Sequence, residues 1–488
     1  MKKLHHILKE VELVRFMGDA EILIKGITAD SRAVEPGFLF VAVRGTQHDG
    51  HHFIDMAIQA GAAAVVLEYV PSGLDSLATY VEVKNAAQAL GLLSSAFYDH
   101  PSRRLQLVGI TGTNGKTTTA TLSYELFRAL GYGVGLISTI ENKIDGTVIP
   151  STHTTPDPVQ LNQLLASMVT AGCTYAFMEV SSHAAHQQRI AGLHFTVAVF
   201  TNITHDHLDY HKTFDKYIAA KKMFFDGLSA DAHALINNDD VHSSVMVQNT
   251  NAEVHTYGVK SDGDFTTRII NNSIDGLQLR IDGNELHTPM RGAFNAWNLT
   301  AVYGTAILLR QDKDAVLTAI SGLGKVPGRL EVVQLSPGGI TGVVDYAHTP
   351  DAVEQVLTTL RDMLVPGKHI VTVIGCGGNR DKAKRPVMAK TAAKYSDKVV
   401  LTSDNPRDEE PEMIIREMEE GLSAEMKHKT LSIVNRKEAI RTAIHMAAKG
   451  DVVLVAGKGH ELYQEIKGVK YPFNDKEIIT ETLKNITG

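Results

Sequence analysis

The sequence has only two cysteines, Cys173 and Cys376, among its 488 residues. They lie far apart, in apolar or glycine-rich surroundings, which favours unpaired thiols in a reducing compartment over a disulfide framework. No window approaches the roughly 18 consecutive apolar residues of a membrane span. The N-terminus lacks the continuous apolar segment of a signal peptide. We therefore expect a cytoplasmic protein without a membrane partner.

The chain also lacks a strong charge of either sign. Its formal net charge is −7, and 43% of its residues are hydrophobic and 21% charged. This balance argues against disorder and against a surface that binds nucleic acid. At about 150 residues per domain, the length predicts roughly three domains, each with its own core. We expect the protein to be a monomer.

Strand-like and helical segments alternate along the chain, which predicts an α/β fold in three domains. Residues 1–101 should form a small N-terminal α/β domain. Residues 102–328 should form a central, doubly wound and mostly parallel sheet. A Pro-Gly pair at 327–328 interrupts the pattern, and residues 329–488 predict a Rossmann-like α/β domain. The strand-like segments are 38–43, 62–67, 105–110, 133–138, 175–180, 196–200, 341–344, 369–374, 398–401 and 451–455.

The segment 108–118 is the most informative part of the chain. It places glycines, a lysine and hydroxyls between the strand-like run 105–110 and a helical pattern over 118–130. Backbone amides of such a turn converge on an anion. Ile110 stands where the strict G-x-x-x-x-G-K-[ST] pattern requires glycine. The remaining register still predicts an ATP phosphate loop rather than a merely structural glycine turn, made of Gly112, Thr113, Asn114, Gly115, Lys116, Thr117 and Thr118.

Three residues around this loop are candidates for the metal-bound triphosphate. Lys116 should contact the β- and γ-phosphates, and Thr117 should bind Mg²⁺. Glu179 closes a strand at the edge where ligands of open α/β sheets gather, which makes it a candidate Mg²⁺ ligand. The alternative for Glu179 is a solvated or helix-capping carboxylate.

The segment 201–211 holds three histidines and two aspartates. It lacks the H-E-x-x-H spacing, and no cysteine lies nearby, which argues against a zinc site. We interpret His207 as a residue of the Mg²⁺–nucleotide site, with an ordinary polar loop as the alternative.

Lys221 and Lys222 are adjacent in a helical stretch over 217–225. The simplest interpretation is a pair of surface lysines. One of them could instead be buried. A buried lysine amine that is neutral can react with CO₂ to give a carbamate, an additional anion for a second Mg²⁺.

The third domain carries polar loops after its strands, at 345–351, 375–382, 403–408 and 456–461. The loop at 403–408 offers one arginine fork and two polar side chains, which suit a ligand with both carboxylate and ammonium groups. A plain Asp-Asn-Pro turn with a solvated arginine is the alternative.

These segments, in this order, resemble the Mur ligase family over essentially the whole chain. The motifs that carry the resemblance are Gly112-Thr113-Asn114-Gly115-Lys116-Thr117-Thr118, Glu179-Val180-Ser181-Ser182-His183, Asp206-His207-Leu208-Asp209, Ala220-Lys221, Gly292-Ala293-Phe294-Asn295, Pro327-Gly328-Arg329, Asp345-Tyr346-Ala347-His348 and Asp404-Asn405-Pro406-Arg407. The resemblance implies a ligase of peptidoglycan synthesis that uses ATP and Mg²⁺. Its substrate would be UDP-N-acetylmuramoyl-L-Ala-D-Glu.

The resemblance also implies roles for individual residues. The UDP end would be bound by Ser31, Thr46, Gln47 and His48. The muramoyl peptide would lie near Thr154, Thr155, Ser181, Gln187 and Arg189. The nucleotide-binding site would be completed by Asn295, Arg329, Asp345 and His348. Lys221 matches the family's carbamylated lysine. The catalytic residues that the resemblance implies are Lys116, Lys221 and His207. The implied metal ligands are Thr117, Glu179, His207 and the Lys221 carbamate.

Within the family, Asp-Asn-Pro-Arg resembles the signature of enzymes that add meso-2,6-diaminopimelate. Arg407 can pair with the distal carboxylate, which lysine lacks. The diaminopimelate pocket would comprise Arg380, Asp404, Asn405, Pro406, Arg407, Gly457 and Glu461. The segment Phe473-Asn474-Asp475 departs from the family's commoner Phe-Asp-Asp, a change that we expect to affect only a peripheral loop.

The implied reaction forms an acyl phosphate on the γ-carboxylate of D-glutamate, which the acceptor amine then attacks. The alternatives are a lysine-adding or folylpolyglutamate-type ligase of the same family, a kinase for a small hydroxyl compound, and a nucleotide-gated binding module without turnover.

Overall fold

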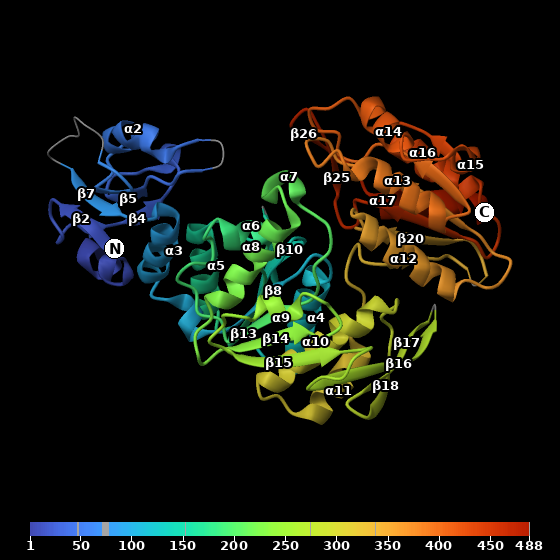
Figure 1. The fold of residues 1–488 in the computed structure, drawn as a ribbon, viewed down its shortest axis with the longest axis horizontal. Coiled ribbons are helices and arrows are strands. Elements are labelled where there is room, and N and C mark those ends of the chain that lie inside the picture. Colours follow the sequence, from blue (N-terminus) through green and yellow to red (C-terminus); the bar gives the residue numbers. More distant parts are fainter. Residues whose placement is uncertain (46–47, 71–77, 152, 274, 337, 488) are drawn as a thin grey trace.

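The computed structural model describes residues 1–45, 48–70, 78–151, 153–273, 275–336 and 338–487. The chain forms three α/β units in succession, and its two ends lie in the outer units (Figure 1). Among the described residues, no helix is both long enough and apolar enough to cross a bilayer. The α/β fold class in three units is as the sequence predicts.

The N-terminal unit is built on a five-stranded sheet in the order β2-β7-β6-β5-β4. The strands of this sheet are β2 (Leu13–Met17), β4 (Gly26–Thr28), β5 (Phe38–Val41), β6 (Ala64–Leu67) and β7 (Thr79–Val83), and a separate two-stranded sheet is formed by β1 (Lys2–Lys3) and β3 (Leu23–Ile24). Its helices are α1 (Leu4–Ile7), α2 (Ile54–Gln59) and α3 (Ala86–Phe97). At Gly91 in α3, an added Cβ would lie 2.5 Å from the carbonyl oxygen of Ala191, so glycine permits this helix to pack closely on the central unit.

The central unit contains an eleven-stranded sheet in the order β11-β10-β9-β12-β8-β13-β14-β15-β16-β17-β18. The strands are β8 (Gln106–Thr111), β9 (Val134–Ile137), β10 (Glu141–Ile144), β11 (Thr147–Pro150), β12 (Tyr175–Glu179), β13 (Val197–Phe200), β14 (His233–Asn237), β15 (Glu253–Gly258), β16 (Phe265–Ser273), β17 (Gly276–Ile281) and β18 (Asn284–Thr288). Strands β8, β9 and β12–β16 run parallel, and antiparallel strands flank them at both ends, where β10 pairs with β9 and β17 with β16.

Helices cover both faces of this sheet. They are α4 (Lys116–Ala129), α5 (Pro158–Thr170), α6 (Ser182–His186), α7 (Leu208–His211), α8 (Phe214–Asp226), α9 (Ser243–Met246), α10 (Phe294–Leu308) and α11 (Lys313–Gly322). In β8, Val108 and Ile110 pack into one core with α4 and α10, whereas Leu107 packs into the core on the other face. A strand buried on both faces is apolar throughout, which explains why the short run 105–110 could be recognised as a strand from the sequence.

The C-terminal unit contains a six-stranded sheet in the order β19-β20-β24-β21-β22-β23, in which only β19 is antiparallel to its neighbour. The strands of this sheet are β19 (Glu331–Val333), β20 (Thr341–Asp345), β21 (Ile370–Ile374), β22 (Lys398–Leu401), β23 (Thr430–Ser432) and β24 (Val452–Ala456), and a separate two-stranded sheet is formed by β25 (Tyr463–Ile466) and β26 (Val469–Pro472). The helices are α12 (Pro350–Met363), α13 (Lys384–Tyr395), α14 (Pro411–Glu419), α15 (Ala424–His428), α16 (Arg436–His445) and α17 (Asp475–Thr487).

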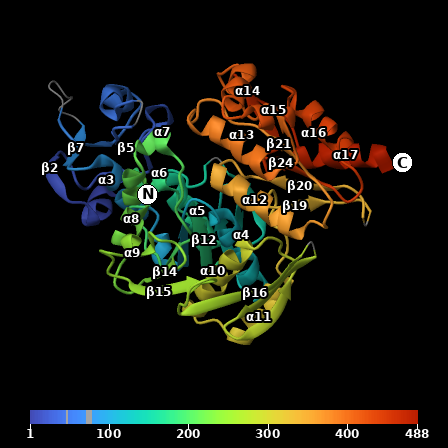
Figure 2. The same ribbon diagram turned by 45° about the vertical axis from the view of Figure 1, so that its right-hand side comes forward.

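The predicted elements correspond to elements of the structure. Each predicted strand overlaps an observed one, and the helical pattern over 118–130 is α4. Helix α12 of the C-terminal unit lies beside the central unit, where Figure 2 shows it above α4 and α10. Residues that follow β8 and β12, such as Thr113 and Ser181, line one cavity with residues of the C-terminal unit, so the carboxyl ends of these strands face that unit.

Candidate active site

The phosphate loop occupies the turn between β8 and α4. Gly112 and Gly115 both have positive φ, 152° and 88°. A Cβ on Gly112 would lie 1.9 Å from Thr201 Oγ1, and one on Gly115 would lie 2.6 Å from Asn298 Oδ1. Both positions therefore require glycine for conformation and for space. The Lys116 ammonium folds back onto its own loop and donates hydrogen bonds to the carbonyls of Gly112 and Thr113, each at 2.9 Å.

The two oxygen-bearing candidates for Mg²⁺, Thr117 in the first turn of α4 and Glu179 at the end of β12, lie in contact. The Thr117 hydroxyl donates to Glu179 Oε2 at 3.0 Å, and the second carboxylate oxygen of Glu179 accepts from the Thr139 amide at 2.6 Å. Glu179 is fully buried. Arg329 reaches the same hydroxyl from the other side of the cleft, with its Nη2 3.1 Å from Thr117 Oγ1. Oxygen donors of this kind suit Mg²⁺.

Lys221 is buried beneath the phosphate loop, 1% exposed, and its Nζ donates to the Gly112 carbonyl at 2.7 Å. Burial, reinforced by the nearby charge of Lys116, holds the pKa of Lys221 well below its ordinary value. The surface-pair interpretation is therefore wrong for Lys221, although its neighbour Lys222 forms an ordinary ion pair with Asp226. A neutral, enclosed amine is the form that accepts CO₂.

His207 stands beside this lysine in the loop that follows β13. Its Nε2 lies 3.3 Å from Asp206 Oδ2, and its ring meets that of His183 edge-on at 5.0 Å. Removal from water lowers the pKa of His207 to about 3, despite the opposing effect of Asp206. The imidazole is therefore neutral at pH 7 and has a ring nitrogen available as an acceptor or metal ligand.

The residues predicted for the muramoyl peptide are linked by hydrogen bonds near Glu179. The Thr155 hydroxyl donates to the Glu179 carbonyl at 2.8 Å and accepts from the Ser181 amide. Arg189 donates to the Thr155 carbonyl and, through two nitrogens, to Gln187 Oε1. This arrangement fixes an arginine fork beside the phosphate loop, a suitable partner for a substrate carboxylate.

From the C-terminal unit, Asp345 and His348 face the phosphate loop. Both Asp345 oxygens accept backbone amides, from Leu330 at 2.6 Å and Ala347 at 2.7 Å, so this carboxylate shapes its own loop. His348 Nδ1 bonds to the Tyr346 carbonyl at 2.9 Å, which leaves Nε2 as the acceptor. Burial lowers the pKa of His348 to about 4.

The predicted acceptor residues meet at one side of the C-terminal sheet. Arg407 adopts a left-handed backbone conformation, with φ 52°, and its Nη1 donates to the Gly378 carbonyl at 2.8 Å. Its Nε lies 3.3 Å from Glu465. The arginine is thus held in place and is not the freely solvated side chain of a plain turn.

Two buried cations, which the sequence did not single out, hold this pocket. Lys458 Nζ donates to Asn405 Oδ1 at 2.9 Å and to Glu461 Oε2 at 2.8 Å. Arg436 forms a paired hydrogen bond with Asp475 at 2.9 and 2.7 Å, and it lies 3.9 Å from Asp404. Because each cation spans segments distant in sequence, no local pattern reveals it.

This arrangement corrects the expectation for Phe473-Asn474-Asp475. The segment is not a peripheral loop, because Asp475 is 1% exposed and neutralises the buried Arg436. Asn474, the residue that departs from the family pattern, accepts the Lys476 amide at 3.1 Å at the start of α17. Asparagine and aspartate both perform this capping role, so the departure preserves the local structure.

A cavity of about 480 Å³ joins these groups between the central and C-terminal units. The predicted residues that line it are Thr113, Asn114, Gly115, Lys116, Thr117, Thr118, Thr154, Thr155, Glu179, Ser181, Arg189, His207, Lys221, Arg329, Asp345, His348, Arg380, Asp404, Asn405, Arg407, Gly457 and Glu461. The described residues Gly112, Gln187, Asn295 and Pro406 stand outside its lining. Asn298, three residues after Asn295 on α10, lines it instead.

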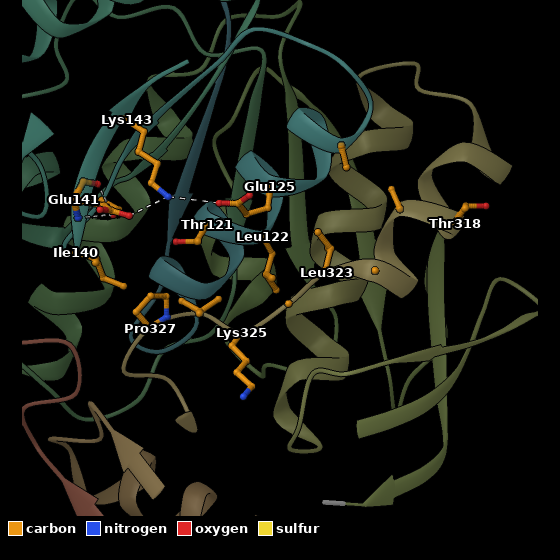
Figure 3. Close-up of a pocket in the computed structure, with 16 residues that line it drawn as sticks. Thr121, Leu122, Glu125, Ile140, Glu141, Lys143, Thr318, Leu323, Lys325 and Pro327 are labelled. Atoms are coloured by element: carbon orange, nitrogen blue, oxygen red, sulfur yellow. Dashed lines mark hydrogen bonds and ion pairs between the residues drawn. The ribbon is translucent and has the colours of Figure 1, made fainter. Parts of the chain in front are cut away.

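The two described residues of the predicted UDP-binding set lie elsewhere. Ser31 and His48 belong to the N-terminal unit and do not line this cavity, whereas Thr46 and Gln47 fall outside the described residues. A separate cavity of about 530 Å³ lies between α4 and α11, where Lys143 pairs with Glu125 and Glu141 (Figure 3). Its described lining contains none of the predicted site residues, so it is not the site of the phosphate chemistry.

The fold and the cavity define a phosphate-loop enzyme of the α/β class whose site spans two units. Residues 110–306 match the Mur ligase middle domain, residues 328–459 match the glutamate ligase domain of Mur ligases, and residues 23–98 match the Mur ligase family catalytic domain. The chain therefore belongs to the Mur ligase family, and the protein is a ligase that uses ATP.

Similar proteins cover nearly the whole chain. The UDP-N-acetylmuramoyl-L-alanyl-D-glutamate–2,6-diaminopimelate ligase of Cytophaga hutchinsonii is 55% identical, over 98% of this chain and 99% of that protein. The ligase of the same name from Phocaeicola vulgatus is 53% identical, over 99% and 100%. A solved structure under the same enzyme name has a TM-score of 0.70 at 31% identity, over 100% of this chain and 99% of that chain. MurF ligase from Thermotoga maritima, solved with ADP, shares the fold with a TM-score of 0.64 at 21% identity, over 96% and 100%.

Proposed function

We propose that this protein joins meso-2,6-diaminopimelate to the D-glutamate γ-carboxylate of UDP-N-acetylmuramoyl-L-Ala-D-Glu, in peptidoglycan synthesis. The observation that carries the proposal is the continuous cavity that contains both Lys116 of the phosphate loop and Arg407 of the acceptor pocket. Relatives that bear this activity in their names are more than 50% identical over almost the full chain. ATP, a UDP-linked precursor and an amino acid are cytoplasmic metabolites, and we place the enzyme there as a monomer without a nucleic-acid partner.

The first step is phosphoryl transfer to the substrate carboxylate. A γ-carboxylate oxygen attacks the γ-phosphorus of ATP, the bond to the β-phosphate oxygen breaks, and ADP leaves. Lys116 and Arg329 would hold the phosphates, and Arg189 would orient the carboxylate. Positioning of this kind, together with cationic groups aimed at the transferring phosphoryl, supplies most of the catalysis in such reactions.

The residues present fit a divalent cation at the phosphate loop. Thr117 and Glu179 supply hard oxygen donors on one side, and His207 with a carbamate of Lys221 would supply further ligands on the other. When bound, Mg²⁺ offsets the charge of the triphosphate. The buried, neutral amine of Lys221 is the feature of this chain that favours carbamylation.

The second step forms the amide. The diaminopimelate amine attacks the acyl carbon, the bond from that carbon to the phosphate oxygen breaks, and phosphate leaves as the amine loses a proton. Arg407 would pair with the distal carboxylate, while Asp404 and Asn405 would take the distal ammonium. The proposed pocket is completed by Arg380, Pro406, Gly457 and Glu461.

The remaining proposed contacts bind the ends of the two nucleotides. The UDP end would be bound by Ser31, Thr46, Gln47 and His48, and the adenosine by Asn295.

A competition assay tests the proposal. The purified protein is incubated with UDP-muramoyl dipeptide, ATP, and equal amounts of diaminopimelate and lysine, and the products are weighed by mass spectrometry. We expect ADP, phosphate and the diaminopimelate amide. Selective incorporation of lysine would reassign the acceptor, a phosphorylated product without an amide would indicate a kinase, and ATP binding without turnover would indicate a binding module.

A further inference from the structure

A cluster of two histidines and a glutamate lies on the central sheet, away from the proposed active site. His233 opens β14, and Glu253 opens the neighbouring strand β15, with His255 two residues further along. The strands are parallel and His233 is paired with Glu253. Because alternate residues of a strand share a face, all three side chains project from the same face of the sheet.

The distances within the cluster match those between ligands of one metal ion. His233 Nδ1 lies 3.1 Å from His255 Nε2 and 3.5 Å from a Glu253 oxygen. His255 Nε2 lies 3.7 Å from the other Glu253 oxygen. Ligands about 2.0–2.1 Å from a tetrahedral zinc ion are separated by roughly 3.3 Å. Small side-chain adjustments would therefore place all three groups around one ion.

We propose that His233, Glu253 and His255 form a binding site for Zn²⁺. Two imidazoles and one carboxylate suit a borderline transition ion and are poor ligands for Mg²⁺ or Ca²⁺, which prefer oxygen. Among the described residues, this is the one group of three histidine, cysteine or acidic side chains whose ligand atoms all lie within 4.8 Å of one another. Three protein ligands leave the fourth position to water.

The backbone holds the cluster in position before any ion binds. The Glu253 amide donates to the Ala232 carbonyl at 3.0 Å, and the His233 amide donates to the Thr196 carbonyl at 2.9 Å. Sites built on paired strands are more precise than sites on loops. The exposed Glu253 carboxylate leaves a path for an ion to enter.

Burial favours the neutral, metal-binding form of the His233 imidazole. Burial lowers the pKa of His233, and the charges of His255 and Arg310 act in the same direction. Arg310 also opposes a bound cation, whereas Glu253 favours one. The competing interpretation is a simple hydrogen bond between the two rings, in which one neutral imidazole donates and the other accepts.

The site lies at the opposite end of β14 from the phosphate loop. Asn237, the last residue of β14, donates to the Thr201 carbonyl, and Thr201 in turn donates to the carbonyl of Asn114 in the loop. An ion at His233 would thus bridge two adjacent strands without touching the nucleotide, and its effect would be on stability rather than on turnover.

Metal titration of the full-length, untagged protein tests the proposal. Chelator-treated protein is titrated with Co²⁺ as a coloured substitute for Zn²⁺, and the bound equivalents are counted from the visible absorption. Zn²⁺ is then titrated by calorimetry, with thermal unfolding measured in parallel. The histidines near Lys221 can also bind metal, so the number of equivalents is compared between variants rather than read from one protein.

We expect His233→Ala and His255→Ala each to lose one Zn²⁺ equivalent and the Zn²⁺-dependent rise in Tm, while ligase turnover stays unchanged. Glu253→Gln should weaken the same equivalent and leave the His–His contact intact, and its unfolding curve verifies the fold independently. His428→Ala, at an exposed histidine on α15, is the matched control and should keep every equivalent. Equal stoichiometry and equal Tm shifts in all four variants would overturn the proposal and leave the ring–ring hydrogen bond.

Discussion

Lys116 and Lys221 both donate to the carbonyl oxygen of Gly112, at 2.9 and 2.7 Å. Two lysines therefore converge on one turn, from helices on opposite faces of the central sheet. Two full positive charges at this separation would repel each other, and the pKa of Lys221 is lowered by burial and by Lys116. Burial lowers the pKa of Lys116 too, and there the nearby carboxylates of Glu179 and Asp206 oppose the shift, whereas Lys116 adds to it at Lys221.

Replacement of Lys221 should abolish most turnover. We expect Lys221→Ala to lower kcat on the order of 100-fold, the scale of losing one group that stabilises transition-state charge. The wild-type enzyme, depleted of CO₂, should regain activity when bicarbonate is added, and the variant should not. Steady-state phosphate release measures both. Lys222→Ala is the adjacent control, and an equal loss in the two variants would argue against a carbamate at position 221.

Replacement of Arg407 should weaken the acceptor specifically. Loss of a charge-assisted pair costs about 1.5–3 kcal/mol, so Arg407→Ala should reduce kcat/KM for diaminopimelate about 10- to 100-fold. The KM values for ATP and for the UDP substrate should change little. Arg416→Ala, at an exposed arginine on α14 of the same unit, provides the control. Unchanged diaminopimelate kinetics in the Arg407 variant would remove this residue from the pocket.

The buried pair of Arg436 and Asp475 should dominate the stability of the C-terminal unit. Asp475→Asn leaves a buried guanidinium without its counter-ion, which costs about 3–5 kcal/mol. We expect a clear drop in the denaturant midpoint. Asn474→Asp preserves the helix cap and should shift stability by less than about 0.5 kcal/mol. If Asp475→Asn left the denaturant midpoint unchanged, the segment would again be regarded as a peripheral loop.

Acid should destabilise the enzyme through its buried histidines. The pKa values of His348 and His207 are lowered by burial to about 4 and about 3, against an ordinary value of 6.5. Below pH 6.5 the unfolded chain takes up protons that the folded state refuses, so stability falls as pH drops towards 4. His348→Gln should lose less stability than wild type between pH 7 and pH 5 in urea unfolding. Parallel losses in both proteins would contradict the lowered pKa of His348.

The local parts of this protein could be predicted from sequence, and the contacts between distant segments could not. The phosphate loop was identifiable because its glycines, lysine and threonine act within one turn between β8 and α4. The local sequence around Lys221 favoured a surface lysine, and only the family resemblance pointed to a functional one, since its burial depends on a loop 109 positions earlier in the chain. Arg436 and Lys458 were missed because each depends on a partner distant in sequence, Asp475 for Arg436 and the Asn405 amide for Lys458.

The two asparagines of α10 illustrate the remaining limit. Asn295 was predicted to contact the nucleotide, yet its side chain bonds to the Arg291 carbonyl and to Asn298. Asn298, one helical turn further, faces the cavity. Residues three apart share a helix face, and only the packing of α10 on α4 decides which amide lines the cavity. The contact of Asn295 with the adenosine stays a prediction.

Arg329 belongs to the segment that joins the central and C-terminal units, and its guanidinium rests on the Thr117 hydroxyl. An arriving triphosphate would compete for that same hydroxyl and attract that same guanidinium. Nucleotide binding and the contact between the two units therefore depend on one side chain. A substitution at Arg329 would weaken both the association of the C-terminal unit with the central unit and the affinity for ATP.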